Sequence, residues 1–380
     1  MHVDRRTLIR GGLAVTGSLL VPRMAFAAAP TDKRFVFIIQ RGAADGLHIL
    51  PPLGDPGYAA LRAPWLESLA GAAKIDGTFS LHPALVRTGQ LFAQKQAIGI
   101  HAVASVYRDR SHFDGQNILE TGGLQAYAEH SGWMNRLVGL LPATDNKALA
   151  VAADVPMALR GPQPVSSYAP SKLPDANADM LARVTQLYAA DAQLHQLWEQ
   201  ALATRAMAGE ADADKGQGGA DMGKIAASLM RADDGARLVM IETGGWDTHS
   251  GQVGRLAAQL RNLDALIGAL ADGLGPAWDQ TMVVVATEFG RTAAINGTNG
   301  TDHGTASAAF VLGGAVRGGR VVADWPGLSQ SALYENRDLK PTNAVENVLV
   351  GTLSSHFGLD PERAARGLFP AQSGVKPLIV

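Results

Sequence analysis

Residues 281–286 read Thr-Met-Val-Val-Val-Ala and run directly into the polar turn Thr287-Glu288-Phe-Gly-Arg291. An unbroken apolar run rich in β-branched side chains is typical of a parallel strand that is buried on both faces. The turn after it then lies at the carboxyl end of the strand, where open α/β sheets place their binding sites. Residues 281–291 therefore predict a buried sheet with a candidate site at one edge.

Further apolar runs alternate with segments of helical periodicity along the chain. We predict strands at residues 34–40, 96–103, 148–153, 237–242 and 307–312. We predict helices that begin at His82-Pro83 and that cover residues 111–121, 132–141, 178–208, 249–272 and 342–357. The alternation predicts an α/β fold with a doubly wound, mainly parallel sheet and helices on both faces. Prolines make residues 48–80 irregular in this interpretation, and the Gly-, Asp- and Ala-rich residues 209–219 form a flexible loop.

The N-terminal segment has the features of an export signal. Asp4-Arg5-Arg6-Thr7 precedes an apolar stretch at residues 11–21, and Ala25-Phe26-Ala27 offers a small-x-small cleavage site. The apolar stretch is too short for a comfortable membrane span, so no permanent membrane anchor is expected. We predict a twin-arginine signal peptide at residues 1–27, contact with the Tat translocon during export, and a periplasmic or otherwise exported protein. Residues 28–380 then form one α/β domain with a helical or loop excursion at about 156–220.

Composition excludes several kinds of site. The 380 residues include no cysteine, so disulfides, thiolate metal ligands and cysteine nucleophiles are excluded. Residues 28–380 carry 29 basic and 34 acidic side chains, so binding to nucleic acid through general charge is not expected. Any metal must be held by histidine, carboxylate or hydroxyl ligands.

Carboxylates and imidazoles gather in the turns at the predicted strand ends. Asp247 and His249 follow one strand, Glu288 follows another, and Asp302-His303 precedes a third. Zn²⁺ accepts histidine together with Asp or Glu, whereas Mg²⁺, Ca²⁺ and Mn²⁺ prefer carboxylates. Such an ion lowers the pKa of a bound water or serine and neutralises an anionic transition state. We predict a site for one of these divalent metals with the ligands Asp45, Asp247, His249, Glu288 and His303. The alternative is that these loop carboxylates are simply solvated.

Ser111 is the candidate nucleophile. It lies between Arg110 and His112 at a predicted strand-to-helix turn. A hydroxyl near a helix N-terminus lies where developing negative charge is favoured, and His112 stands beside it as a catalytic partner. The alternative is a simple N-cap, since serine is a preferred capping residue.

Arg41, Arg110 and Arg291 stand beside the predicted ligands in three separate turns. Guanidinium groups clamp phosphate or sulfate oxygens through paired hydrogen bonds, so Arg110 and Arg291 are candidate oxyanion clamps. The alternative is that these arginines pair with the neighbouring carboxylates and serve the structure.

Taken together, several motifs resemble those of the exported family called domain of unknown function 1501. They are the twin-arginine start, Arg41-Gly-Ala-Ala-Asp-Gly46, Leu81-His-Pro-Ala84, Arg110-Ser-His-Phe113, Gly132-Trp133, Gly244-Gly-Trp-Asp-Thr-His249, Thr287-Glu-Phe-Gly-Arg-Thr292, Asp302-His-Gly304 and Gly313-Gly314. The resemblance covers nearly all of residues 28–380. It implies a fold akin to the alkaline phosphatase and sulfatase superfamily, whose members hydrolyse phosphate or sulfate esters with metals and a nucleophilic Thr, Ser or modified Cys.

The resemblance also implies roles by position. Asp45 matches the first-strand metal aspartate, Ser111 the nucleophile, and Glu288 the aspartate of one metal site. The other metal site is implied to use Asp247, His249 and His303.

Two departures from the superfamily pattern alter this expectation. Phe289 stands where the superfamily has a histidine, and the spacing from Asp247 to His249 is shorter than usual. A standard two-zinc site is therefore not expected. A single ion assisted by His112 or Asp302 fits these departures, and so does a site that has lost catalysis.

Two functions follow as hypotheses. The first is an exported metal-dependent hydrolase of a small anionic phosphate or sulfate ester, with Ser111 or a metal-bound water as nucleophile. The second is an exported, non-catalytic binding or assembly protein with a degenerate metal site, in which residues 156–220 offer a surface to a protein partner.

Overall fold

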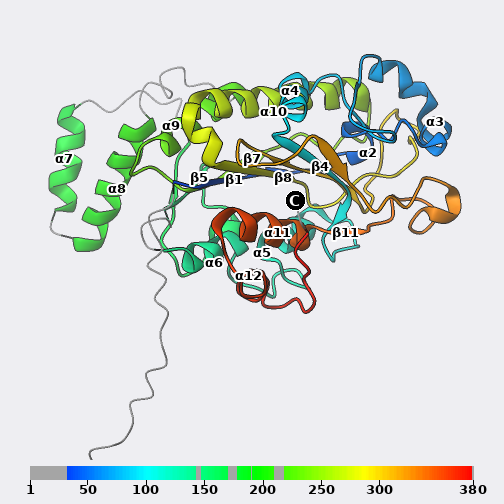
Figure 1. The fold of residues 1–380 in the computed structure, drawn as a ribbon. Helices are drawn as coiled ribbons and strands as arrows, with labels where there is room; N and C mark the ends of the chain where they lie inside the picture. Colours follow the sequence, from blue (N-terminus) through cyan, green and yellow to red (C-terminus); the bar gives the residue numbers. More distant parts are fainter. Residues whose placement is uncertain (1–31, 143–146, 170–177, 190, 209–217, 379–380) are drawn as a thin grey trace, which may run out of the picture. The chain divides into compact units, whose positions relative to one another are not determined.

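The computed structural model describes residues 32–142, 147–169, 178–189, 191–208 and 218–378 (Figure 1). The strands are β1 (Arg34–Gln40), β2 (Ala73–Lys74), β3 (Ser80–Leu81), β4 (Ala97–Ala104), β5 (Ala148–Val151), β6 (Ser166–Ser167), β7 (Leu238–Thr243), β8 (Thr281–Ala286), β9 (Ser307–Leu312), β10 (Arg320–Val322) and β11 (Asn343–Ala344). The α-helices are α2 (Gly46–Ile49), α3 (Pro56–Arg62), α4 (Val86–Ala93), α5 (His112–Thr121), α6 (Trp133–Leu140), α7 (Ala178–Tyr188), α8 (Ala192–Ala208), α9 (Gly219–Arg231), α10 (Gln252–Leu274), α11 (Val345–Phe357) and α12 (Pro361–Leu368).

Within the described residues, nine strands form one sheet in the order β10-β4-β9-β8-β1-β7-β5-β6, with β11 paired to β4. Strand β1 lies between β8 and β7 and is parallel to both. Strand β9 is antiparallel to both of its neighbours, β4 and β8. The predicted α/β fold with a mainly parallel sheet is therefore confirmed.

The reversed direction of β9 decides where the residues before it lie. The N-terminal end of an antiparallel strand meets the C-terminal ends of its neighbours. Residues 301–304, which precede β9, therefore lie at the same sheet edge as the turns that follow β4, β7 and β8. This edge is where the predicted ligands were expected to converge.

The core has two layers, one on each face of the sheet. In β1, Phe35, Phe37 and Ile39 pack in one core, while Val36 and Ile38 pack in the other, as the two-residue period of a strand requires. Figure 1 shows α4, α9 and α10 over one face and α6, α11 and α12 over the other. Each fully buried side chain of this size contributes about 1.5–3 kcal/mol to stability. The predicted placement of helices on both faces is confirmed.

The region predicted to be irregular, residues 48–80, in fact contains helix α3 and a following 3-10 helix, Ala63–Leu69. Asp55 caps α3 by accepting a 2.8 Å hydrogen bond from Gly57 N, and Pro56 occupies the first helical turn. Proline is tolerated there because the first-turn N–H has no intrahelical partner. Pro56 and Pro64 therefore stand at the starts of helices in this region and do not interrupt them.

Helix α4 begins at Val86, a few residues after the expected start at His82-Pro83. Its first N–H groups are satisfied by α10, because Asp264 accepts hydrogen bonds from Arg87 N at 2.7 Å and Thr88 N at 2.8 Å. A distant carboxylate, which no local pattern indicates, therefore helps to fix this boundary.

The predicted excursion at residues 156–220 is only partly described. Strand β6 extends the sheet by pairing in parallel with β5, and α7 and α8 follow it. The predicted signal peptide at residues 1–27 and most of the predicted loop at residues 209–219 lie outside the described residues. No helix in the described part of the chain combines the length and apolar character needed to cross a bilayer.

Candidate metal centre

Histidine and aspartate side chains from three separate connections meet at the C-terminal edge of the sheet. His112 begins α5, Asp247 and His249 lie between β7 and α10, and His303 precedes β9. Each of His112, Asp247 and His303 offers a ligand atom that lies within 4.8 Å of the other two. This arrangement can hold a metal ion.

His249 joins the same cluster. Its Nε2 lies 3.0 Å from Asp247 Oδ1 and 3.0 Å from His303 Nε2, and His303 Nε2 lies 3.2 Å from Asp247 Oδ1. His112 Nε2 lies 3.5 Å from Asp247 Oδ2. Tetrahedral zinc with bonds of 2.0–2.1 Å separates its ligand atoms by about 3.3 Å. His112, Asp247 and His303 lie close enough together to share one ion, and His249 lies beside Asp247 and His303.

The other ring nitrogen of each histidine is held by an acceptor. His112 Nδ1 lies 2.9 Å from Glu288 Oε1, and His303 Nδ1 lies 2.9 Å from the carbonyl oxygen of Arg110. His249 Nδ1 lies 3.2 Å from Asp302 Oδ1. Carbonyl oxygens and ionised carboxylates only accept hydrogen bonds, so a neutral ring that donates through Nδ1 to its outer partner has its lone pair on Nε2, which faces Asp247. Metal-ligating histidines have this same outer hydrogen bond.

The charges around the cluster favour a divalent cation. Asp247, Glu288 and Asp302 contribute three carboxylates, and the buried guanidinium of Arg291 donates to Asp247 Oδ1 at 2.6 Å. With neutral imidazoles, two negative charges remain. When His249 and His303 both carry the hydrogen on Nδ1, their Nε2 lone pairs and Asp247 Oδ1 lie within 3.2 Å of one another and repel unless a cation lies among them.

The pKa shifts at the cluster agree with neutral His303 and ionised carboxylates. Burial lowers the pKa of His303, and a positive charge on His112, when that ring is protonated, lowers it further. Burial alone would raise the pKa values of Asp247 and Glu288, but both are lowered. The hydrogen bond and charge of Arg291 lower the pKa of Asp247, and hydrogen bonds from His112 and Gln116 lower that of Glu288.

Glu288 was predicted to be a ligand, but the structure places it behind His112. Its Oε1 accepts hydrogen bonds from His112 Nδ1, Gly42 N at 2.8 Å and Gln116 Nε2 at 3.0 Å. The hydrogen bond to Glu288 opposes the effect of burial and raises the pKa of His112. His112, predicted as a catalytic partner, thus offers Nε2 to the cluster, and Glu288 orients it.

Asp45 was also predicted to be a ligand, but its bonds are to residues outside the cluster. The fully buried guanidinium of Arg62 lies 2.6 Å from Asp45 Oδ2, and Gln252 Nε2 donates to the same oxygen. A carboxylate whose charge is already neutralised has less need of a second cation. Asp45 and Glu288 are therefore both bonded to other side chains, and neither belongs to the group of His112, Asp247 and His303.

The predicted catalytic arginines are paired with carboxylates, as the alternative interpretation proposed. Arg291 binds Asp247, and Arg110 donates to Asp338 Oδ2 through Nε at 3.1 Å and Nη2 at 2.8 Å. Arg41, the third arginine considered, binds Glu120 and Glu242. Arg291 therefore contacts the cluster directly through Asp247, whereas Arg110 and Arg41 bind carboxylates outside the four cluster side chains.

Ser111 occupies the N-cap position of α5, directly before His112. Its side chain makes no capping hydrogen bond, although its backbone carbonyl accepts a 2.8 Å bond from Gly115 N. Tyr107 Oη accepts a 3.1 Å hydrogen bond from Ser111 N and also bonds the Ser111 side chain, so Ser111 stays a candidate nucleophile whose hydroxyl contacts Tyr107 and does not cap the helix.

Residues 32–369 match the family model described as Protein of unknown function (DUF1501). The chain belongs to this family. A search of curated proteins gave no match for this DUF1501 protein.

Three solved structures are similar to the DUF1501 protein at low level. The PH0037 protein from Pyrococcus horikoshii is 13% identical, with a TM-score of 0.38, over 75% of this chain and 86% of that one. The C-terminal periplasmic domain of EcEptC from Escherichia coli, solved in complex with Zn, is 8% identical, with a TM-score of 0.38, over 75% and 74%. Ps i-CgsB in complex with k-i-k-neocarrahexaose is 12% identical, with a TM-score of 0.39, over 90% and 76%.

Reasoning from the sequence missed two polar residues that support the cluster of the DUF1501 protein. Gln116 bridges Arg41 and Glu288, with Arg41 Nη1 2.9 Å from its Oε1. It lies four residues after His112 on α5, and residues at this spacing share a helix face, so periodicity offered a signal. Asp338 lies in a polar turn without strand or helix periodicity, which offered none.

Phe289, noted in the sequence as a departure from the superfamily pattern, packs against His112 and His303. Its ring stacks on His112 at 5.1 Å and contacts His303 at 5.4 Å between ring centroids. The side chain is 2% exposed. Phe289 therefore supplies no ligand, and its apolar ring packs against two of the imidazole rings and helps to hold them in place.

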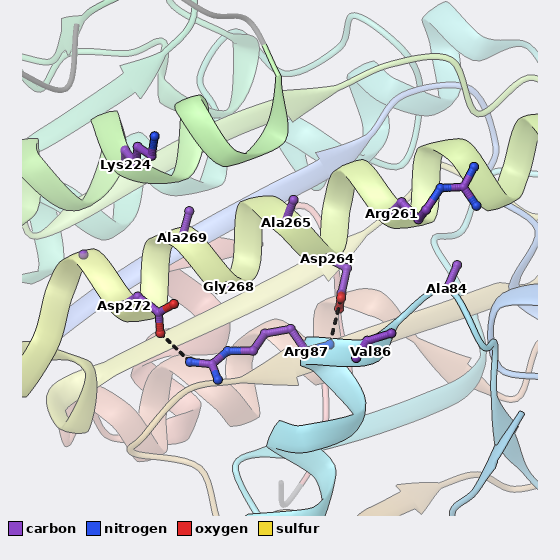
Figure 2. Close-up of a pocket in the computed structure, with 11 residues that line it drawn as sticks. Ala84, Val86, Arg87, Lys224, Arg261, Asp264, Ala265, Gly268, Ala269 and Asp272 are labelled. Atoms are coloured by element: carbon purple, nitrogen blue, oxygen red, sulfur yellow. Dashed lines mark hydrogen bonds and ion pairs between the residues drawn. The ribbon is translucent and has the colours of Figure 1, made fainter. Parts of the chain in front are cut away.

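A separate hollow of about 620 Å³ lies on the outer helices of the DUF1501 protein (Figure 2). Its walls come from α4, α9 and α10, and Figure 2 shows Arg87 bound to Asp264 and Asp272 across it. The cluster residues do not line this hollow. It is therefore distinct from the candidate centre.

Proposed function

We propose that this DUF1501 protein is an exported, single-metal hydrolase of phosphate or sulfate esters, with a fold akin to the alkaline phosphatase and sulfatase superfamily. The observation that carries the proposal is the convergence of three histidine Nε2 atoms on Asp247, each ring being held through Nδ1 by an acceptor. A set rich in nitrogen favours Zn²⁺ over Mg²⁺ and Ca²⁺, which prefer oxygen ligands. His112, Asp247, His249 and His303 would hold the ion.

When bound, such an ion lowers the pKa of a coordinated hydroxyl or water and neutralises charge on the ester. The residues supply position and electrostatics. Arg291 lowers the pKa of Asp247, so this carboxylate stays ionised at neutral pH. Ser111, at the N-terminus of α5, lies where an anionic oxygen is favoured, which supports it as the attacking group.

The proposal is tested by elemental analysis of protein purified without chelator, together with hydrolysis of chromogenic phosphate monoesters, phosphate diesters and sulfate esters. We expect about one divalent ion per chain and measurable turnover of at least one ester class. Protein that binds no metal and turns over none of these esters would contradict the proposal.

Two variants separate the roles of the residues. His303→Ala should lose both the ion and turnover, because it removes one ligand nitrogen. Ser111→Ala should keep the ion; it should lose at least 100-fold in kcat if Ser111 attacks the ester, and little if water attacks. His130→Ala, which changes an exposed histidine outside the cluster, is the matched control and should behave as the wild type.

A second candidate, the exported binding or assembly protein, is favoured by the pairing of Asp45 with Arg62 and of Arg110 and Arg291 with carboxylates. These pairs occupy groups that would otherwise bind a second metal or the substrate. A bound ion without turnover of any ester, and physiological function that survives Ser111→Ala, would support this candidate.

A further inference from the structure

The turn at residues 334–338 holds a buried carboxylate, that of Asp338, which binds neighbours of the candidate metal centre. Residues 334 and 338 pair across this turn, with Tyr334 N 2.9 Å from Asp338 O and Asp338 N 3.0 Å from Tyr334 O. The side chain of Asp338 is 0% exposed. A buried carboxylate is costly unless it is paired, so its partners indicate what it does.

Both partners of Asp338 are arginines that also contact His303. Asp338 Oδ2 accepts from Arg110 Nε at 3.1 Å and Nη2 at 2.8 Å, and Oδ1 accepts from Arg337 Nε at 2.8 Å. The carbonyl oxygen of Arg110 accepts the hydrogen bond from His303 Nδ1 at 2.9 Å. Arg337 Nη2 donates to the carbonyl oxygen of His303. Two routes from one carboxylate therefore end on the same histidine.

The backbone of Arg110 is held in an unusual conformation. Its φ angle is 63°, in the left-handed region that side chains with a Cβ rarely adopt. The side chain is anchored by Asp338 and, at the surface, by Glu335 at 2.6 Å. Arg110 lies two residues before His112, the first residue of α5, so this conformation directs its carbonyl toward His303 while His112 faces the cluster.

We propose that Asp338 is a positioning residue: through Arg110 and Arg337 it fixes the tautomer and direction of His303, so that His303 Nε2 faces the metal. The proposal rests on the metal centre proposed above and adds to it a residue that does not touch the ion. It assigns the pair of Arg110 with the buried Asp338 to orientation of a ligand, whereas a purely structural role would leave the ligand unaffected.

The test compares Asp338→Asn with Glu335→Gln in the full chain. Asparagine keeps the shape of the side chain and removes the charge that binds both arginines. Glu335→Gln removes the other carboxylate that binds Arg110. The side chain of Glu335 is 56% exposed. Binding of Co²⁺ is measured by competition with a chromogenic chelator, and the visible spectrum of bound Co²⁺ reports the ligand geometry.

We expect Asp338→Asn to weaken Co²⁺ binding by roughly 10- to 100-fold and to change the visible spectrum, as loss of outer hydrogen-bonding partners does in other metal sites. Glu335→Gln should stay within about twofold of the wild type, because exposed ion pairs contribute little. Wild-type affinity and an unchanged spectrum in Asp338→Asn would overturn the proposal.

A second variant covers the case in which Asp338→Asn does not fold. Arg337→Lys keeps the positive charge at a side chain that is 46% exposed, but a lysine cannot bind Asp338 and the His303 carbonyl together. It should also weaken Co²⁺ binding and alter the spectrum. Wild-type behaviour of this variant would count against the route through Arg337.

Nuclear magnetic resonance of labelled histidine rings separates this proposal from the proposed function. In metal-free protein, His303 should carry its hydrogen on Nδ1 in the wild type and in Glu335→Gln, and should show a mixture of tautomers in Asp338→Asn. If the wild type binds no Co²⁺, the metal centre fails, and the tautomer alone decides the role of Asp338. An unchanged Nδ1–H tautomer in Asp338→Asn would then refute that role.

Discussion

At the scale of single residues, each histidine of the centre depends on an acceptor that the motif around it does not reveal. His112 relies on Glu288, His249 on Asp302, and His303 on the carbonyl of Arg110. The sequence indicated that Glu288 and Asp302 belong to the site, because both stand in turns at strand ends. It did not indicate that they bind histidines. A carboxylate that ligates a metal and a carboxylate that orients a histidine are the same residue type at the same sheet edge.

His101 in β4 provides a prediction about pH at this scale. It is fully buried; Nε2 donates to the Leu50 carbonyl at 3.1 Å, and Nδ1 accepts from Ala102 N at 2.8 Å. Burial lowers the pKa of His101 to about 4, whereas an unfolded chain has a histidine pKa of about 6.5. Between these values the unfolded state binds a proton that the folded state does not.

His101 therefore contributes stability above pH 6.5 that is lost as the pH falls toward 4, by up to about 1.4 kcal/mol per pH unit. Urea unfolding between pH 7.5 and pH 4.5 measures the slope. His101→Gln keeps a donor for the Leu50 carbonyl and should reduce the slope by about one proton. Equal slopes for the two proteins would show that His101 does not titrate in this range.

At the scale of elements, the connection between β8 and β9 couples the fold to the centre. Gly290 N donates to Thr305 O at 2.9 Å, and Gly304 N donates to Gly290 O at 2.8 Å. This pairing places Arg291 beside His303. The two segments lie so close that a Cβ at residue 290 would come within 1.8 Å of Ala306 O.

Gly290→Ala should therefore force the two segments apart, at a cost of roughly 1–3 kcal/mol or more, and weaken metal binding. Gly297→Ala is a matched control in the same connection, because a Cβ there meets no atom within 4 Å. It should change the free energy of unfolding by less than about 0.5 kcal/mol. Urea unfolding and metal titration measure both variants; a Gly290→Ala protein as stable as the control would contradict this account.

At the scale of the whole molecule, the proposed ion links connections that lie far apart in the sequence. Its ligands come from the start of α5, the β7–α10 turn and the segment before β9. An ion that binds only the folded chain stabilises it, by about 2.7 kcal/mol when present at 100 times its dissociation constant. Removal of the ion should therefore destabilise the entire domain.

We expect a chelator to lower the Tm of the wild type by on the order of 5 °C, and to leave the Tm of His303→Ala unchanged. Differential scanning calorimetry with and without chelator measures both shifts. A wild-type Tm that does not respond to chelator, or an equal shift in His303→Ala, would argue against an ion at this centre.

By itself, the sequence determined the buried strands and the edge at which the polar turns meet. β1 and β8 have the bounds predicted, because continuous apolar runs such as residues 34–40 and 281–286 have few alternatives to a strand that is buried on both faces. Asp247, His249 and His303 stand in turns at strand ends, so they could be proposed as ligands without contacts, whereas His112, which begins α5, was predicted only as a catalytic partner.

Only the tertiary structure decided which of these side chains face one another. The antiparallel direction of β9 brings His303 to Asp247. Arg62 from α3 forms an ion pair with Asp45, and His112 bonds to Glu288. Asp338, from a turn without periodicity, completes the arrangement behind His303. Such pairings depend on distances across the fold, and residue type and local spacing carry no information about these distances.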